Sequence, residues 1–113
     1  MRTNLWMTSL KTGASFVLAL LLTGCAAWAA DAKAGQAVYT RACRSCHGAD
    51  GAPSAAVAKM LKVEMRDLKV ALGSLSDADI RKIIVEGKGK MVATKGVAGA
   101  DLDNAIAYLR TLK

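Results

Sequence analysis

The run Cys43-Arg44-Ser45-Cys46-His47 constrains this chain more than any other stretch. Two thiols three residues apart, followed directly by a histidine, are typical of a site where haem is attached covalently. The thiols can bond to the two vinyl groups on one edge of the ring, and the histidine is then carried beneath the ring to bind the iron. The motif therefore predicts one covalently bound haem c, held by Cys43 and Cys46, with His47 as an axial ligand of the iron.

Two other kinds of chemistry use a similar pair of cysteines. A dithiol redox pair is expected in a strand-helix setting like that of thioredoxin, and a zinc site needs more ligands than this motif supplies. His47 is the only histidine of the chain, and the one further cysteine, Cys25, lies in a segment with the character of a targeting signal. Haem attachment is therefore the favoured interpretation, and a haem-free thiol oxidoreductase stays open as an alternative.

The N-terminal segment has the composition of an export signal. Residues 1–12 carry two basic side chains and no acidic one, and residues 13–22 form an apolar run shorter than a membrane span. A lipobox before Cys25 predicts a signal over residues 1–24 and lipidation of that cysteine. A small-x-small pattern would instead let ordinary signal peptidase remove residues 1–29. We expect export to the periplasm in both cases, with a membrane anchor as a lipoprotein in the first.

A single small domain remains after the signal. We expect residues 25–31 to form a short N-terminal linker and residues 32–113 to form the folded domain. A chain of this length with few aromatic side chains is small for a self-sufficient hydrophobic core. A buried haem would supply the missing apolar bulk, so we predict that the haem-free mature chain is largely unfolded.

The charge balance favours some partners over others. Arg2 and Lys11 are two of the 16 basic residues, so 14 remain beyond position 24 against 9 acidic residues, which gives about +5. A modest positive charge favours an acidic partner protein or an anionic membrane surface. Nucleic acid is a poor candidate, because the compartment is wrong and aromatic side chains are scarce.

The pattern along the folded part predicts helices and no strands. Residues 31–46 have helical composition and place Gly35, Tyr39 and Cys43 at four-residue spacing on one face. A glycine inside a helix costs about 1 kcal/mol relative to alanine, so Gly35 suggests close approach by another element. Further helices are expected over residues 55–62, 76–86 and 101–112, with loops over 48–54 and 87–91 and an irregular, partly helical connection over 63–73. The architecture is therefore all-α.

The helix over residues 76–86 has the clearest boundaries. Ser76 and Asp79 have the spacing of a capping box, and isoleucines follow at helical spacing. Gly87 is a plausible end of the helix. The glycines and lysines that come next allow no regular structure, so we expect a loop that presents Met91.

Together these features resemble those of the small class I bacterial cytochromes c, over nearly the whole mature chain. The resemblance depends on the C-x-x-C-H-G run after a helix carrying Gly35 and Tyr39, on residues 86–91 (EGKGKM) and on residues 107–110 (AYLR). It implies the class I cytochrome c fold, with three to four helices wrapped around one covalently bound haem. The N- and C-terminal helices would then cross, packing Gly35 and Tyr39 against the helix that bears Tyr108.

The resemblance also implies the second axial ligand of the iron. In this family it is a methionine on a glycine- and lysine-rich loop after the third helix, which corresponds to Met91, with Met60 and Met65 as rival candidates. Val92 follows where the family usually has proline, so the loop is less constrained. Pro53 corresponds to the family proline whose carbonyl accepts the ring N–H of the proximal histidine, although an ordinary turn proline fits the pattern equally well.

Ligands on both faces of the iron leave no open position, which suits an electron carrier rather than an enzyme. We therefore expect a monomeric protein that passes single electrons between periplasmic or membrane redox proteins. Two basic runs would guide docking to an acidic face of the partner, or would only be a solvated surface. The alternative function is a haem protein with a labile distal ligand that acts on or senses a small molecule such as peroxide. The basic residues are Lys88, Lys90 and Lys95 near the methionine, and Lys59, Lys62, Arg66 and Lys69.

Overall fold

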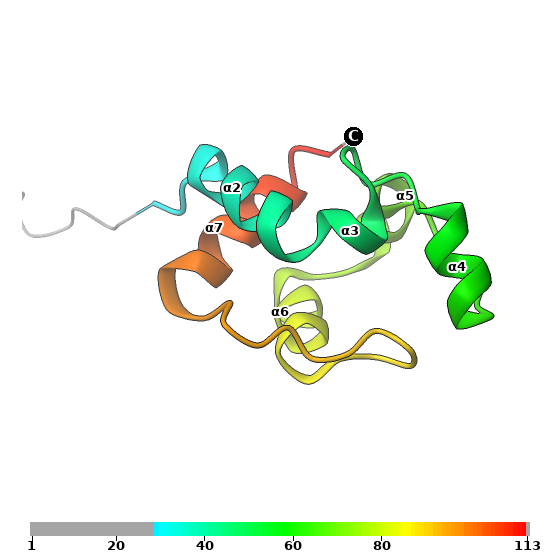
Figure 1. The fold of residues 1–113 in the computed structure, drawn as a ribbon. Helices are drawn as coiled ribbons and strands as arrows, with labels where there is room; N and C mark the ends of the chain where they lie inside the picture. Colours follow the sequence, from blue (N-terminus) through cyan, green and yellow to red (C-terminus); the bar gives the residue numbers. More distant parts are fainter. Residues whose placement is uncertain (1–28, 113) are drawn as a thin grey trace, which may run out of the picture.

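Three helices of ten or eleven residues form the framework of the computed structural model, which describes residues 29–112. They are α2 (Ala32–Ala42), α6 (Asp77–Glu86) and α7 (Gly99–Leu109). Shorter helices connect them (Figure 1): α3 (Arg44–His47), α4 (Ala55–Leu61), α5 (Leu68–Ala71) and the 3-10 turn η1 (Leu72–Ser74). This described part contains no β-strand, which confirms the predicted all-α class I fold. Of its helices, none is long and apolar enough to span a membrane.

Residues 1–28 of the predicted export signal, with the lipobox and Cys25, lie outside the described residues, which begin just before the alternative cleavage site after residue 29. Helix α2 begins at Ala32 and is capped by Asp31, whose carboxylate accepts hydrogen bonds from two amides of the first turn. The amide of Asp31 donates to the side-chain oxygen of Asn104 on α7 (2.7 Å). The start of the folded domain is therefore tied directly to its C-terminal helix.

Helices α2 and α7 cross at Gly35. A Cβ atom added there would lie 1.8 Å from the carbonyl oxygen of Asn104 and 2.9 Å from the Cβ of Tyr108, so the two backbones meet where only hydrogen fits. One turn further along α2, the rings of Tyr39 and Tyr108 lie 5.2 Å apart with an interplanar angle of 54°. This tilted arrangement is one that aromatic pairs favour. The predicted crossing of the N- and C-terminal helices is confirmed.

Replacing Gly35 by alanine is expected to destabilise the protein by about 2 kcal/mol or more, because overpacking typically costs about 1–3 kcal/mol. The gain in helix propensity, about 1 kcal/mol, is the smaller effect, since the obstructing atom is backbone and cannot swing away. Gly73→Ala is a matched control, because nothing lies within 4 Å of its Cβ position. Chemical denaturation of the haem-loaded proteins measures the free energy of unfolding of both variants. A Gly35→Ala variant as stable as the parent would contradict this close approach.

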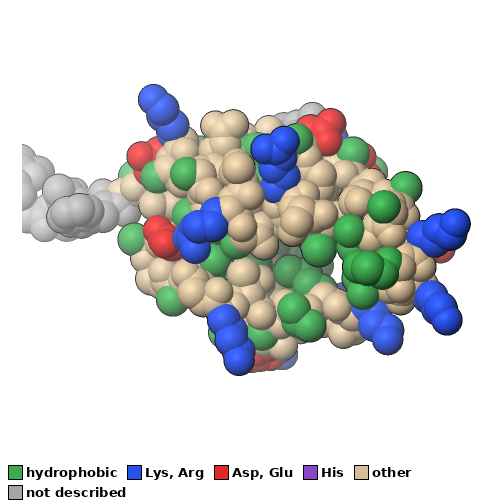
Figure 2. Space-filling model, in the orientation of Figure 1, with side chains coloured by type: hydrophobic (Ala, Val, Ile, Leu, Met, Phe, Trp, Pro, Cys, Tyr) green, Lys and Arg blue, Asp and Glu red, His purple; other side chains and the backbone are tan. Residues whose placement is uncertain are grey.

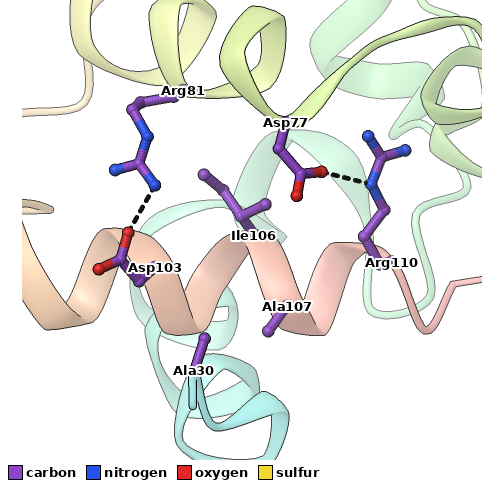
Figure 3. Close-up of a pocket in the computed structure, with 7 residues that line it drawn as sticks. All are labelled: Ala30, Asp77, Arg81, Asp103, Ile106, Ala107 and Arg110. Atoms are coloured by element: carbon purple, nitrogen blue, oxygen red, sulfur yellow. Dashed lines mark hydrogen bonds and ion pairs between the residues drawn. The ribbon is translucent and has the colours of Figure 1, made fainter. Parts of the chain in front are cut away.

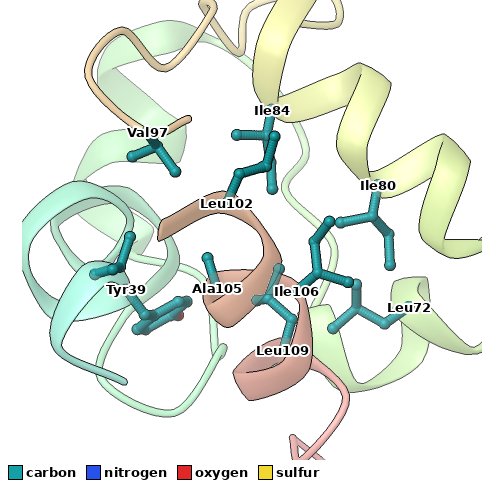
Figure 4. Packing of buried hydrophobic residues seen from close by; sticks show 10 residues of the cluster. Tyr39, Leu72, Ile80, Ile84, Val97, Leu102, Ala105, Ile106 and Leu109 are labelled. Carbon is teal, nitrogen blue, oxygen red and sulfur yellow. The ribbon is translucent and has the colours of Figure 1, made fainter. Parts of the chain in front are cut away.

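The hydrophobic core lies where α6 and η1 pack onto the crossed pair (Figure 4). None of its members falls between Tyr39 and Leu72. Residues 40–71, which include α3, α4 and α5, therefore contribute no fully buried hydrophobic side chain and have little protein core of their own. The buried cluster consists of Val38, Tyr39, Leu72, Ile80, Ile84, Val97, Leu102, Ala105, Ile106 and Leu109.

Helix α6 begins and ends where the sequence predicts. The hydroxyl of Ser76 accepts a hydrogen bond from the amide of Asp79 (3.1 Å), and the carboxylate of Asp79 accepts one from the amide of Ser76 (3.0 Å), which completes the capping box. Hydrogen bonds from the hydroxyl and amide of Ser76 hold the pKa of Asp79 below its ordinary value. Gly87 ends the helix with φ +81°.

Two predicted helices differ from the observed ones by more than one residue at an end. The first, expected over residues 31–46, is interrupted at Cys43, whose backbone (φ −123°, ψ −32°) leaves helical geometry before α3 begins. The last, expected over residues 101–112, begins at Gly99 and ends at Leu109. The break at Cys43 falls where the chain turns from the helix crossing toward the cysteine pair, a tertiary requirement that helical periodicity does not reveal.

Candidate haem site

The predicted haem motif, residues 43–47, consists of the helix break at Cys43 and the whole of α3. The amide of Cys43 donates to the carbonyl of Tyr39 (2.8 Å), and the carbonyl of Cys43 accepts from the amide of His47 (3.0 Å). Residues three and four apart lie on one face of a helical turn. This local geometry presents Cys46 and His47 together with Cys43, so the three predicted haem-binding residues of the motif form one constellation.

The two cysteines are half-buried and neither forms a disulfide within the described chain. Burial raises the pKa of the Cys43 thiol, and the neighbouring Cys46 adds to the effect. A redox-active thiol needs the opposite, a lowered pKa that favours the thiolate. Among residues 29–112, no group of three or more His, Cys, Asp or Glu side chains could hold a metal ion, so the zinc alternative finds no further ligands there.

The environment of His47 favours the neutral form of its imidazole. Burial lowers its pKa, which favours the neutral form that coordinates metals. Its Nδ1 atom is buried and finds no hydrogen-bond partner in the part of the chain that the structure describes. Such an unpaired buried nitrogen is costly. The Nδ1 atom of His47 is therefore shielded from solvent and has no hydrogen-bond partner among the described residues.

Pro53 lies close to the haem motif. The amide of Ser54 donates to the carbonyl of Cys46 (3.1 Å), which draws this segment against α3. The predicted bond from Nδ1–H of His47 to the carbonyl of Pro53 is not formed, because Nδ1 has no partner among residues 29–112. The structure thus brings Pro53 near the motif, and its role as acceptor stays a prediction.

A hollow with hydrophobic side chains in its floor opens beside the motif. Figure 2 shows it on the face where Figure 1 places α3 on one side and α6 with the following segment on the other. Two free thiols, a neutral imidazole and an apolar hollow fit the vinyl groups, the iron and the ring of a haem respectively. When bound there, haem supplies a one-electron iron couple. The residues present therefore fit a covalently held haem.

A tight turn after α6 fixes the backbone of Met91. The amide and carbonyl of Lys88 pair with the carbonyl and amide of Met91 (2.8 and 3.0 Å) in an isolated β-bridge. Gly89 has φ +58° and Lys90 does not have a positive φ, which is the pattern of a type II′ turn. A Cβ added to Gly87 would lie 2.6 Å from the carbonyl oxygen of Met91. The expected loop is present, and two backbone hydrogen bonds close it into a tight turn.

Met91 is presented by a different element than the haem motif, the segment that follows α6. It is half-buried, whereas Val92 beside it is 80% exposed. The amide of Thr94 donates to a carbonyl of α6 (2.8 Å) and ties the segment back to that helix, a constraint that compensates for the missing proline. Of the rival methionines, Met60 is 71% exposed on α4 and Met65 is half-buried in the irregular segment that follows.

The basic residues expected to guide docking are all exposed. Two of them lie in the turn before Met91 and two lie at the end of α4. Lys69 is near a carboxylate, with its Nζ atom 3.8 Å from Asp50. Figure 2 shows basic side chains projecting from the margin of the face that contains the hollow. Positive charge thus surrounds the face of the molecule that contains the hollow.

A groove of about 220 Å³ between α6 and α7 is separate from this site. Two ion pairs cross it (Figure 3), Arg81 with Asp103 and Arg110 with Asp77 (2.8 Å). The guanidinium of Arg110 also donates to the carbonyl of Leu72, the first residue of η1 (2.7 Å), and to the carbonyl of Leu75, which follows η1 (2.6 Å). Because its charged groups are paired with one another, this groove joins α7 to the start of α6 rather than holding a ligand.

Sequence reasoning placed Tyr39 at the helix crossing but missed the bond that its hydroxyl makes. That hydroxyl donates to the carbonyl of Gly48 (2.7 Å), directly after the haem motif. The sequence signal for this bond was the presence of tyrosine rather than phenylalanine, because phenylalanine would fill a purely packing position equally well. The hydrogen bonds from Arg110 to the carbonyls around η1 were also missed, because these acceptors lie more than 30 residues away in the sequence.

The helical fold, the C-x-x-C-H motif on α3 and the hollow beside it define a small c-type cytochrome of class I. Residues 30–109 match the family described as cytochrome C oxidase, cbb3-type, subunit III, and the chain belongs to this family. The solved structure of the KustC0563 c-type cytochrome is similar, with a TM-score of 0.58 and 25% identity over 70% of this chain and 96% of that one. No curated protein matches the sequence. The chain is accordingly a haem c protein of the electron-transfer class.

Proposed function

We propose that this protein is a monomeric carrier of single electrons between periplasmic or membrane redox proteins. One haem c is held by Cys43 and Cys46, with its iron between His47 and Met91. The observation that supports this proposal is the hollow that opens between α3, which carries the motif, and α6 with the segment that presents Met91. Ligands on both faces leave no open position, and a soft, neutral thioether raises the potential. A closed coordination sphere suits electron transfer rather than catalysis on a bound substrate.

The absorption spectrum of the oxidised and reduced mature protein, produced with c-type maturation machinery, tests the proposal. We expect one haem per chain and a low-spin spectrum with the weak far-red band of sulfur-ligated ferric iron. A high-spin spectrum would indicate an open iron and would favour a haem protein that acts on or senses a small molecule such as peroxide. A protein without haem would instead favour a thiol oxidoreductase that uses the two cysteines.

We propose further that the protein is exported and tethered to the membrane through a lipidated Cys25. The support is the order of the N-terminal sequence, where a lipobox directly follows the apolar run. The intact mass of the mature protein tests this. A lipidated chain beginning at Cys25 is expected, whereas a chain beginning at Ala30 would mean release into the periplasm as a soluble protein.

The proposed partner is a redox protein with an acidic docking face. The family description names a subunit of a cytochrome c oxidase, so such an oxidase is the first acceptor to test. Electrostatic steering raises association rates by about 10- to 1000-fold, and it weakens as the screening length falls from about 30 Å at 0.01 M salt to about 8 Å at 0.15 M. We expect the second-order transfer rate to fall about tenfold or more over this range.

Variants identify which charges contribute to this salt dependence. Lys88→Gln with Lys90→Gln is expected to lower the rate and flatten its salt dependence, because both lysines are exposed beside the turn that presents Met91. Lys33→Gln on α2 removes an exposed charge from a different element and serves as the control. A rate that does not respond to salt in the parent would mean that the lysines are only a solvated surface.

A further inference from the structure

The hydroxyl of Tyr39 joins the helix crossing to the haem motif. Tyr39 is 1% exposed, and its ring packs against Tyr108 (Figure 4 shows Tyr39 beside α7). The hydroxyl donates to the backbone carbonyl of Gly48 (2.7 Å) and lies 3.4 Å from the carbonyl oxygen of His47. A phenol has one proton, so the shorter contact is the main bond. Burial, with smaller effects from Cys43 and Tyr108, raises the pKa of Tyr39 to about 12, which keeps this proton in place.

The carbonyl that Tyr39 binds lies just beyond a helix end. Helix α3 ends at His47, and the last carbonyls of a helix have no partner within it. Gly48 leaves the helix with φ +75°, and a Cβ there would lie 2.1 Å from the carbonyl oxygen of Ala52. The amide of Gly48 donates to the carbonyl of Arg44 (2.9 Å). Gly48 is therefore held on its amide side by α3 and on its carbonyl side by Tyr39.

We infer that Tyr39 is a positioning residue for the axial histidine: its hydroxyl fixes the backbone that follows His47 and thereby the direction in which the imidazole is presented to the haem iron. The inference rests on the proposed ligation by His47. Phenylalanine would preserve the ring pair with Tyr108, so packing alone does not require the hydroxyl. Removal of the Tyr39 hydroxyl would leave the carbonyl of Gly48, the residue that follows His47, without this donor. Groups around a metal ligand set its orientation and its strength as a donor.

The test compares Tyr39→Phe with Tyr108→Phe in the haem-loaded protein. Tyr108 belongs to the same ring pair and is half-buried, and within the described residues its hydroxyl makes no hydrogen bond, so it is a matched control. We expect Tyr39→Phe to shift the reduction potential and the paramagnetically shifted NMR signals of the His47 ring, whereas Tyr108→Phe leaves both at parental values. A loss of stability with parental potential and signals would overturn the inference, as would equal shifts in the two variants.

A second measurement applies if Tyr39→Phe does not fold. The chain has two tyrosines, so in the Tyr108→Phe background Tyr39 is the only one. Incorporation of fluorotyrosine then makes this hydroxyl more acidic without removing it. We expect the His47 signals to move, and unchanged signals would overturn the inference. Failure of the proposed function would show in the parent itself, as a spectrum without low-spin haem, and would overturn the inference with it. Failure of the inference alone leaves the parental spectrum intact.

Discussion

A variant carrying Cys43→Ala and Cys46→Ala, produced as the mature chain without haem, is expected to lose most of its helical circular dichroism and its cooperative unfolding transition. The physical reason is the distribution of the core. Ordering a backbone residue costs about 1–2 kcal/mol, and residues 40–71 offer no fully buried hydrophobic side chain to offset that cost. Two of their apolar side chains, Met60 and Val70, are 71% exposed, so we expect haem to supply the burial that this segment lacks.

The control for this variant lies inside the motif. Ser45 is exposed, and Ser45→Ala leaves both thiols and the histidine in place. We expect it to bind haem and to unfold cooperatively like the parent. Circular dichroism and thermal denaturation of the three proteins make the comparison. A double cysteine variant with native-like helix content and a cooperative transition would show that the helix crossing and the core on α6 and α7 fold without the cofactor.

Local chemistry allowed prediction of those parts of the fold that depend on neighbouring residues. Helix α6 is the clearest case, because Ser76 and Asp79 satisfy its first amides and Gly87 supplies the backbone conformation at its end. The haem motif is likewise local, since one helical turn brings its cysteines and histidine together. In both cases the interacting atoms lie within four or so residues of one another, so spacing in the sequence is enough.

The remaining features depend on contacts between distant segments. The spacing of Gly35 suggested close approach by another element, but the atom that excludes a side chain there is the carbonyl of Asn104 on α7. The break of the first helix at Cys43 and the bond from Tyr39 to Gly48 arise from the same packing. The family resemblance identified which helices cross, whereas helical periodicity alone identified only their faces.

The methionine turn shows how a departure from the family pattern can mislead. Valine in place of proline after Met91 suggested a loosely held loop. The reciprocal bonds with Lys88, the close approach of Gly87 and the bond from Thr94 to α6 instead hold it firmly. Proline after the methionine restricts the backbone in the family pattern, and backbone hydrogen bonds restrict it here. This constraint bears directly on how tightly a thioether at this position would bind iron.

Replacing Met91 by alanine is expected to convert the low-spin ferric spectrum to one without the far-red sulfur band and to lower the reduction potential. Axial ligands move haem potentials over about 0.8 V, so we expect a fall on the order of tenths of a volt. Haem should remain attached, because Cys43, Cys46 and His47 are unchanged and do not depend on the turn. The potential by redox titration and the spectrum of the purified variant measure these effects.

Two further methionine variants make this prediction discriminating. Met60→Ala removes a side chain that is 71% exposed on α4 and should leave spectrum and potential at parental values. Met65→Ala removes a half-buried thioether from the irregular segment and is expected to alter packing at most. If Met91→Ala keeps the low-spin spectrum and the parental potential while Met65→Ala loses them, the iron ligand is Met65. In that case the tight turn after α6 would serve to display its lysines, and both axial ligands of the iron would come from the part of the chain that runs from α3 to α5.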